Sequence, residues 1–361
     1  MNVLSVFGGI EAGRLALIRA GIEVNNYYSS EVDKFANQVT KHHFPEINQM
    51  GDVTKWREWG IDWSSIDLFI GGSPCQGFSF AGKQAGTKAV VNGEEVIVET
   101  LEQYLELCER KKAGESIEFL SQSYLFWEYV AILKHIQSYN PKVKFLLENV
   151  KMKKELLQMI DDALGVTSVV INSALLSAQN RVRHYWANWE ITQPEDKGIL
   201  LRDILEGDAI GADIVINQGR SARRSNIDKS HCLMARDYKG FGNQDITGVK
   251  IANHRPCERI KDGSAGHIAN ATDIKGMDCI KRVYGQDGKA PTLTTMGGGH
   301  REPKVSCGEV TYRKLTPTEC ARLQTFPDGF CESIVSNSQS YKAYGNSWTV
   351  DVIAHIFRCM P

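Results

Sequence analysis

A cysteine behind a proline, in a glycine-rich stretch, is the residue of this sequence best placed to do chemistry. Cys75 stands in GGSPCQGFSFAGKQ, directly after the apolar run DLFI that ends at Ile70. A cysteine that only packs would normally sit inside a strand or helix, whereas this one follows a predicted strand on backbone bent by Pro74. A thiolate in such a place can act as a nucleophile. A lone Pro-Cys pair, however, is more often structural.

One carboxyl group and two arginines extend this candidate site. Glu148 follows apolar residues in VKFLLENV, so its strand would deliver it to the same carboxyl edge of a sheet as Cys75. A carboxyl group beside apolar surface can stay protonated enough to donate a proton. In QNRVRH, Arg181 and Arg183 alternate along a predicted strand. Their guanidinium groups can donate two hydrogen bonds to a carbonyl oxygen or a phosphate. Each feature alone has a plain structural explanation, but together they favour a catalytic site.

Acidic residues and glycines earlier in the chain indicate a cofactor site. The turn VFGGIEAG lies between the first predicted strand and the first helix, where backbone can approach a nucleotide-like ligand. Glu31 and Asp52 follow the next two predicted strands, and an acid there can hold ribose hydroxyls. On these residues alone, a nicotinamide enzyme and a plain turn with two surface acids both stay open.

The elements that must position these residues form an α/β pattern. Short β-rich runs alternate with helical patterns, which predicts a doubly wound, mostly parallel sheet. The expected strands include 2–7, 67–72 and 143–150, and the expected helices include 11–21, 32–44 and 123–139. From about residue 191 to 308, glycine, asparagine and isolated charges replace the helical periodicity, which predicts a second, smaller, irregular β-rich domain.

Bulk composition narrows the class of protein. The 361 residues carry a net charge of −1 and are 42% apolar, which is ordinary for a globular chain long enough for two domains. Nine cysteines, with no CxxC pair, favour a reducing cytosol and predict neither a disulfide framework nor a metal site. No apolar run approaches the ~20 residues of a membrane span, and MNVLSVFGG lacks the basic start of a signal peptide.

The second domain is locally basic. Residues 217–261 hold ten Lys/Arg against four Asp/Glu, a local net charge of +6 in a nearly neutral chain. A solvated surface would explain this charge, but its concentration in a glycine-rich domain fits phosphate contacts better. The predicted DNA contacts are Arg220, Arg223, Arg224, Lys229, Arg236, Lys239, Arg255 and Arg301.

The ordered set FxG…E…D…PCQ…ENV…QxRxR…GNS resembles the DNA cytosine-5 methyltransferase family, bacterial or phage type, over residues 1–190 and 311–361. The first 72 residues are especially similar to the animal de novo subgroup. The resemblance implies a Rossmann-like catalytic domain over 1–190, a target-recognition domain over 191–312 and a return segment over 313–361. It also implies that a helix over 341–357 packs back on the catalytic domain.

The resemblance implies a reaction on a cytosine flipped out of duplex DNA. The Cys75 thiolate would attack carbon 6, while Glu148 protonates or hydrogen-bonds ring nitrogen 3 with support from Asn149. Arg183 would hold the ring carbonyl oxygen, and Arg181 would brace Glu148 and a nearby phosphate. The resulting enamine would take the methyl group of S-adenosylmethionine at carbon 5. Loss of the carbon 5 proton would then expel Cys75, with S-adenosylhomocysteine as the second product.

The resemblance also assigns binding residues. Gln76 matches the residue that fills the space left by the flipped base. Glu31 would bind the cofactor ribose, and Asp52 the adenine amino group. The full predicted cofactor set is Phe7, Gly9, Ile10, Glu31, Val32, Asp52, Val53, Gly72, Pro74, Leu125, Asn346 and Ser347.

The sequence departs from the family pattern in four places near the cofactor. Ser5 replaces the aspartate common in bacterial members, and Glu11 stands where they have glycine. Gln122 and Ser123 replace the usual Arg-Gly before a Leu-Phe pair. Cofactor contacts at Ser5 and Glu11 are therefore expected to differ from those of the family, and the family pattern carries over less well to the loop at Gln122 and Ser123.

An insertion over 88–120 lengthens the family's mobile catalytic loop, which would run here over 73–121. Inside it, TLEQYLELCERKKAG predicts a helix with Thr100 and Gln103 as a capping box and Gly114 as its stop. We hypothesise that this helix modulates loop closure over DNA or docks on the recognition domain.

Two other functions stay in view. One is the same chemistry on tRNA, which the length and charge of the recognition domain disfavour. The other is an inactive DNA-binding regulatory relative, which the intact Cys75, Glu148, Arg181 and Arg183 disfavour. We expect a monomer that acts on double-stranded DNA in the cytoplasm of a bacterial or phage-infected cell, either with a cognate restriction endonuclease or as a solitary enzyme.

Overall fold

The computed structural model describes most of the chain. The described residues are 1–74, 88–207, 217–218, 221–222, 255–259, 267–293, 300–306 and 311–361. Eight predicted site residues lie outside these ranges, namely Cys75, Gln76, Arg220, Arg223, Arg224, Lys229, Arg236 and Lys239. The side chain of Arg255 also lies outside the description, although its backbone forms part of a strand.

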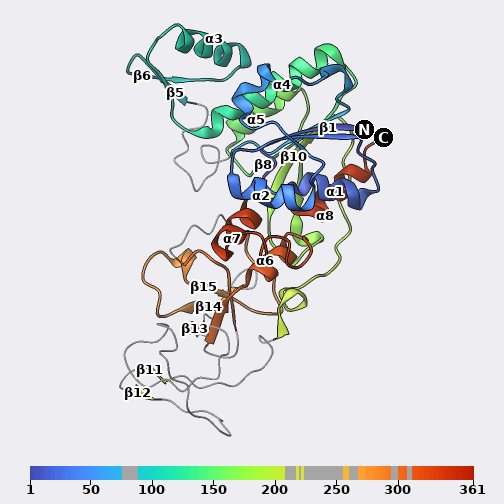
Figure 1. Ribbon diagram of the computed structural model, residues 1–361. Helices are drawn as coiled ribbons and strands as arrows, with labels where there is room; N and C mark the ends of the chain where they lie inside the picture. The colour runs from blue at the N-terminus through green and yellow to red at the C-terminus, as the bar shows by residue number, and fades with distance from the viewer. Residues whose placement is uncertain are drawn as a thin grey trace.

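A seven-stranded sheet organises the end of the molecule that holds both termini (Figure 1). Its strand order is β3-β2-β1-β4-β8-β10-β9, and β10 alone runs antiparallel to its neighbours. The strands are β1 (Asn2–Val6), β2 (Asn26–Ser30), β3 (Asn48–Gln49), β4 (Leu68–Gly71), β8 (Lys144–Val150), β9 (Val169–Asn172) and β10 (Val182–Ala187).

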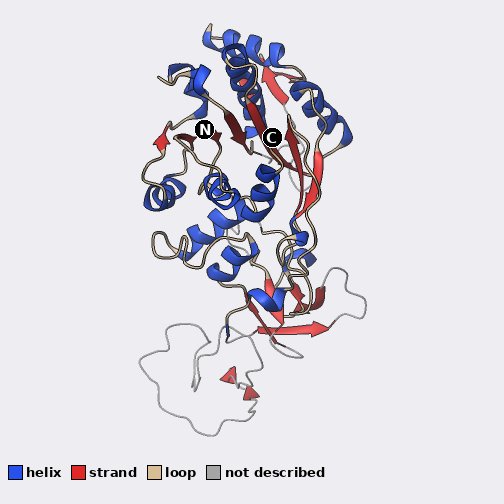
Figure 2. Cartoon of the chain, turned by 90° about the vertical axis from the view of Figure 1, so that its right-hand side faces the viewer, coloured by secondary structure: helices blue, strands red, loops and turns tan. Residues whose placement is uncertain are grey.

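Helices cover both faces of this sheet (Figure 2). Val3 and Ile70 belong to one apolar core, whereas Leu4 and Phe69 belong to another, as the alternation of side chains along a strand requires. The first core is closed by α1 (Ala12–Ala20), α2 (Lys34–His43) and α8 (Val350–Arg358), and the second by α4 (Leu125–Tyr139) and α5 (Lys154–Leu164). The predicted doubly wound, mostly parallel sheet is therefore confirmed. Within the described part of the chain, no helix is long and apolar enough to cross a membrane.

The C-terminal segment differs from its prediction. A single helix was expected over 341–357, but the structure has α7 (Asn337–Asn346) and α8 (Val350–Arg358) with extended backbone between them. The break has a physical cause, because the carbonyl of Ser347 accepts a hydrogen bond from the buried guanidinium of Arg181 instead of continuing a helix. Helix α8 packs against α1, so this segment does return to the N-terminal domain.

A small closed barrel organises the described part of the second domain. Its strands are β13 (Arg255–Arg259), β14 (His267–Ala271), β15 (Arg282–Tyr284), β16 (Lys304–Ser306) and β17 (Thr311–Lys314). The last strand crosses the predicted boundary at 312. Ala290 pairs with Gln179 in a parallel bridge, and Leu293 lies in the same core as α1 and α8. One of the two cores of the sheet domain therefore continues into the second domain, which also has a small core of its own around Ala269 and Val283.

The insertion is a folded module in its described residues, 88–119, rather than a long loop. A sheet of order β6-β5-β7 packs with one helix, in β5 (Lys88–Val91), β6 (Glu94–Ile97), α3 (Leu101–Lys112) and β7 (Ile117–Phe119). The predicted capping box of Thr100 and Gln103 is confirmed. The prediction that this helix docks on the recognition domain is wrong for the described part of that domain, because α3 packs on α4 at the opposite end of the molecule (Figure 1).

Candidate active site

The register of four neighbouring strands brings predicted site residues to one edge of the sheet. Val6 lies opposite Ser30 in β2 and opposite Gly71 in β4, and Gly71 lies opposite Leu147 in β8. The next residue of each strand therefore stands at the same carboxyl edge, where ligands bind in open α/β sheets. These four residues are Phe7, Glu31, Gly72 and Glu148.

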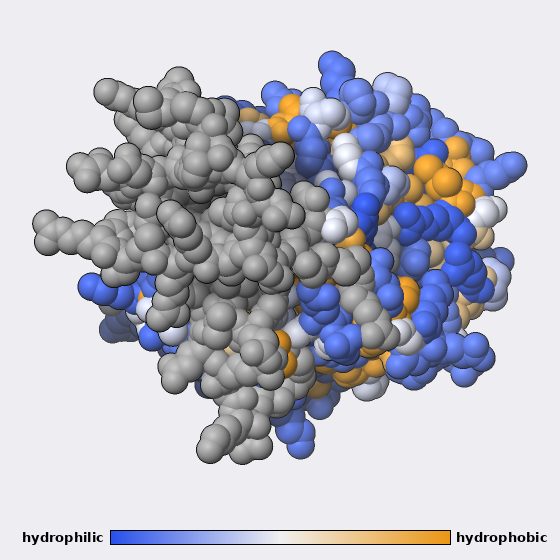
Figure 3. Space-filling view, turned by 90° about the horizontal axis from the view of Figure 1, so that it is seen from below, coloured by the Kyte–Doolittle hydropathy of each residue, from blue (hydrophilic) through white to orange (hydrophobic). Residues whose placement is uncertain are grey.

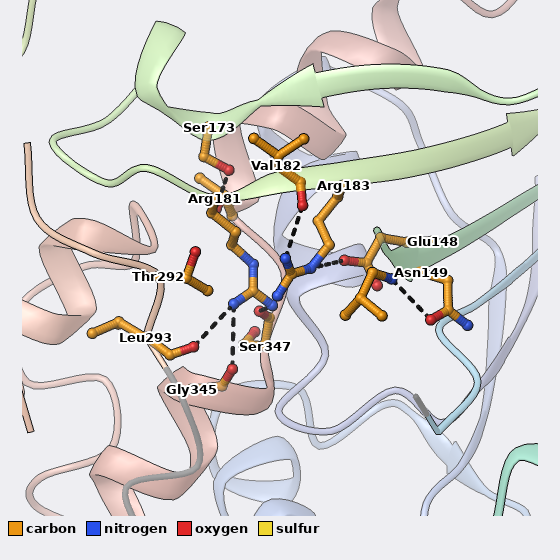
Figure 4. Close-up of polar contacts among 12 residues, drawn as sticks. Glu148, Asn149, Ser173, Arg181, Val182, Arg183, Thr292, Leu293, Gly345 and Ser347 are labelled. Carbon is orange, nitrogen blue, oxygen red and sulfur yellow. Dashed lines mark hydrogen bonds and ion pairs between the residues drawn. The ribbon is translucent and has the colours of Figure 1, made fainter. Parts of the chain in front are cut away.

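A buried ion pair occupies the centre of this edge. The Nε of Arg183 lies 3.0 Å from Oε1 of Glu148, and these two side chains are only 13% and 10% exposed. The antiparallel pairing of β8 and β10 sets this contact, since Tyr185 lies opposite Glu148 and Arg183 is two residues away on the same face. Oε1 accepts no hydrogen bond in the described structure, so the attraction is mainly Coulombic. The pair places a carboxylate and a guanidinium side by side (Figure 4).

Gly72 lets this carboxylate approach the chain that leads to the cysteine. A Cβ at Gly72 would lie 3.4 Å from Oε2 of Glu148 and 2.9 Å from Nε1 of Trp348. A larger residue would therefore push against both side chains. Gly72 precedes Ser73 and Pro74, the last described residue before Cys75.

Asn149 forms hydrogen bonds with Ser73, in the segment that leads to the cysteine. Its buried Nδ2 donates to Oγ of Ser73 at 3.1 Å and to the Ser73 carbonyl at 3.4 Å, while its Oδ1 accepts from the amide of Val150. Asn149 was predicted to support Glu148 against the base. The hydrogen bonds of its side chain instead position the residues directly before Pro74.

Arg181 has a different partner set from the one predicted. It was expected to brace Glu148, but the ion-pair partner that the structure gives Glu148 is Arg183. The guanidinium of Arg181 is buried and donates to backbone carbonyls (Figure 4). The acceptors are Ser347 at 2.9 Å, Leu293 at 3.3 Å and Gly345 at 3.4 Å. Arg181 therefore ties the start of β10 to both the recognition domain and the return segment.

Glu31 has a rigidly held carboxylate at the cofactor side of the edge. Oε2 accepts from the amide of Gly9 at 2.9 Å, and Oε1 accepts from the amides of Val32 and Asp33 at 2.7 and 2.8 Å. Three amide donors fix both oxygens without using a side-chain partner. Beside it, the apolar side chain of Val32 is 72% exposed. This pairing of a fixed acceptor with an open apolar side chain suits a ligand that has both hydroxyls and a flat ring.

The first turn is bent tightly enough to bring backbone to the edge. Phe7 has φ 60° and Gly9 has φ 57°, and the first is a costly conformation for a residue with a Cβ. A Cβ at Gly8 would lie 1.9 Å from the carboxylate of Glu11, so only glycine fits there. Strained backbone of this kind is typical of ligand-binding turns.

The other predicted cofactor residues lie at element ends around this edge. Asp52 caps the 3-10 helix η1 (Val53–Glu58) by accepting from the amide of Thr54 at 2.9 Å. Leu125 begins α4, and Asn346 ends α7. The hydroxyl oxygen of Ser347 is buried and has no hydrogen-bond partner among the described residues.

Glu11 is a functional candidate that sequence reasoning noticed only as a departure. Its carboxylate is fully buried and accepts from the hydroxyls of Tyr27 at 2.6 Å, Ser5 at 3.1 Å and Ser29. Burial raises the pKa of Glu11 to about 7, although the three hydroxyl donors act against the shift. The signal in the sequence was a glutamate inside a glycine turn with hydroxyl residues in the two flanking strands.

The stability of the protein is expected to depend on pH through Glu11. Because its folded pKa is raised from 4.5 to about 7, the group favours the folded state below pH 4.5 and loses this contribution as pH rises through 7. Linkage gives a loss of about 2 kcal/mol between pH 5.5 and 8.5. Glu11→Gln should remove that part of the slope in urea unfolding at the two pH values. The exposed control Glu23→Gln should retain it, and equal slopes in all three proteins would contradict the assignment.

The strand order defines a Rossmann-like α/β fold, a class in which ligands bind at the carboxyl edge of the sheet. A family model described as C-5 cytosine-specific DNA methylase matches residues 1–100 and 112–361. The chain therefore belongs to that family, and it is a DNA (cytosine-5) methyltransferase of the bacterial and phage type.

Individual relatives agree with this assignment. The orphan methyltransferase M.SPBetaI of Bacillus phage SPbeta is 28% identical, with 99% of this chain and 97% of that protein covered. The type II methyltransferase M.HhaI of Haemophilus parahaemolyticus is 25% identical over 99% and 93% of the two chains. Among solved structures, the Entamoeba histolytica methyltransferase EhMeth superposes with a TM-score of 0.54 at 13% identity, over 99% and 97% of the two chains. This last likeness supports the fold alone.

Proposed function

We propose that this chain methylates carbon 5 of a cytosine flipped out of duplex DNA, with Cys75 as the nucleophile. The observation that carries the proposal is the buried pair of Glu148 and Arg183 at the sheet edge beside Gly72, three residues before Cys75. A cytosine ring presents nitrogen 3 next to a carbonyl oxygen. A carboxyl group and a guanidinium held side by side are complementary to these two neighbouring atoms.

Each step of the proposed chemistry has its own group. The Cys75 thiolate forms a sulfur–carbon bond at carbon 6, and Glu148 donates to nitrogen 3, so the electron pair reaches carbon 5 as an enamine. Arg183 donates to the carbonyl oxygen and also keeps Glu148 in place. Bound S-adenosylmethionine supplies the electrophilic methyl group. A base then removes the carbon 5 proton, the sulfur–carbon bond breaks, and Cys75 returns as a thiolate.

The ends of β1, β2 and β4 are suited to S-adenosylmethionine. Glu31 offers two fixed carboxylate oxygens to ribose hydroxyls, and the exposed Val32 offers apolar surface to adenine. Asp52 would accept from the adenine amino group, and the hydroxyl of Ser347, which has no partner in the described part of the chain, would bind a polar end of the cofactor. We propose that the other predicted cofactor residues also contact S-adenosylmethionine, around the carboxyl edge of the sheet.

Duplex DNA would bind along the recognition domain. Arg301, whose side chain is described, is exposed there. The coloured surface that is seen from below is mostly hydrophilic, with apolar patches (Figure 3). Several relatives are named orphan methyltransferases of Bacillus phages. These names favour a solitary enzyme over one paired with a restriction endonuclease. We place it as a monomer in the cytoplasm of a bacterial or phage-infected cell.

Bisulfite sequencing of DNA from a methylation-free host that expresses this chain tests the proposal. We expect unconverted cytosines at one recurring sequence in plasmid and host DNA, and none with an empty vector. The same treatment of host tRNA is the second arm. Fully converted DNA together with newly protected tRNA cytosines would replace the proposal with the tRNA reaction.

A further inference from the structure

A buried carboxylate of the catalytic domain accepts a hydrogen bond from the inserted module. The hydroxyl of Tyr104 in α3 donates to Oε1 of Glu128 in α4 at 2.6 Å. Tyr104 is 2% exposed and Glu128 is 4% exposed, so this hydrogen bond is shielded from water. The family model leaves out residues 101–111, which is nearly all of α3. Tyr104 is therefore an addition of this chain to the family pattern.

The same carboxylate also holds the cofactor side of the site. Its Oε2 accepts from Nε1 of Trp56 at 2.8 Å, and Arg57 lies 3.7 Å from the same oxygen. Both residues belong to η1, the short helix that Asp52 caps. Glu128 thus joins the inserted helix to the element that presents the proposed adenine contact.

A second route runs through stacked aromatic rings. Phe119 at the end of the module stacks on Tyr124 with ring centroids 4.4 Å apart, and the ring of Tyr104 lies 5.6 Å from that of Phe119. Tyr124 directly precedes Leu125. Its neighbour Ser123 donates to the carbonyl of Pro74 at 3.3 Å. The module therefore contacts the residues that flank both the cofactor edge and the start of the catalytic loop.

We infer that the inserted module is a positioning element for the cofactor site, acting through Tyr104 and Glu128 on η1 and Asp52. The inference rests on the proposed function, because it takes Asp52 as a cofactor contact. A buried carboxylate needs donors for both of its oxygens. The module supplies the donor to Oε1 through Tyr104, and Trp56 supplies the donor to Oε2. Without the tyrosine donor, Glu128 must find another, which loosens its hold on η1.

Tyr104→Phe in the full chain tests this inference, since it deletes one hydroxyl and keeps the ring. We expect the Kd for S-adenosylmethionine, measured by isothermal titration, to rise by roughly 2- to 30-fold, the range for residues coupled through a contiguous network. The KM for DNA should change less than about twofold, because the described part of the recognition domain lies at the other end of the molecule. A purely structural role would lower thermal stability without this split between the two substrates.

Two further variants make the outcome decisive. Glu109→Gln on the exposed face of α3 is the matched control and should leave both constants unchanged. Tyr104→Phe combined with Trp56→Phe should cost less than the sum of the two single changes, because both act on Glu128. An unchanged Kd in Tyr104→Phe, or additive effects in the double variant, would overturn the inference alone. Failure of the unaltered protein to bind S-adenosylmethionine would instead remove the proposed function on which it rests.

Discussion

Replacing Cys75 by alanine is expected to abolish methyl transfer while leaving the binding of DNA and S-adenosylmethionine nearly intact. The substitution removes the atom that activates carbon 5, and no other described side chain at the sheet edge is a thiol. Loss of a covalent nucleophile costs on the order of 10⁶-fold in a well-studied serine protease, so we expect a decrease of at least about 10⁴-fold here. Incorporation of labelled methyl groups into duplex DNA under single-turnover conditions measures it.

Duplex DNA that carries 5-fluorocytosine gives this prediction a second readout. With S-adenosylmethionine present, methyl transfer leaves carbon 5 carrying fluorine where a base would otherwise remove a proton, so the bond between Cys75 and carbon 6 should persist. The unaltered protein should then form an adduct that survives denaturing electrophoresis, and Cys75→Ala should form none. Cys279→Ala, which changes an exposed cysteine of the second domain, should behave as the unaltered protein. An adduct with Cys75→Ala would place the nucleophile elsewhere.

The sheet was predictable because its determinants are local. The buried strands β4 and β8 each contain a continuous apolar run, at 68–70 and 145–147, and the glycines that end helices adopt the left-handed conformation that those ends require. Gly21 closes α1 with φ 74°. The residues at the carboxyl edge of the sheet could be predicted from the strands themselves, because the residue after each parallel strand must lie at that edge. Glu31 and Glu148 could therefore be assigned to one site from sequence.

The partners within the site were not predictable, because they come from residues distant in the chain. Arg183 of β10 was correctly placed beside Glu148, yet the alternation of Arg181 and Arg183 in the sequence cannot tell which one meets the carboxylate. Arg181 bonds to the carbonyl of Ser347, 166 residues away, and the same contact breaks the helix expected over 341–357. The insertion shows the same limit. Its capping box was readable from Thr100 and Gln103, whereas its docking partner Glu128 was set by tertiary packing.

Replacing Glu148 by glutamine is expected to reduce kcat by about 10² to 10⁴-fold, the usual contribution of a positioned general acid. Glutamine keeps the volume and can still donate a weak hydrogen bond to the base, but it cannot transfer a proton to nitrogen 3. Single-turnover methylation of duplex DNA measures the chemical step. Glu155→Gln, which changes an exposed acidic residue in the first turn of α5, is the control that should retain full activity.

The partner substitution separates catalysis from stability at the same pair. Arg183→Gln leaves the buried Glu148 carboxylate without its cation, and removing one member of a buried ion pair costs about 3–5 kcal/mol in the free energy of unfolding. Combining it with Glu148→Gln removes the uncompensated charge, so urea unfolding should recover much of that loss. Methylation should stay as low as in the worse single variant, because neither the proton donor nor the guanidinium is restored. Recovery of activity together with stability would mean that the pair only supports the fold and that the base is recognised by other residues.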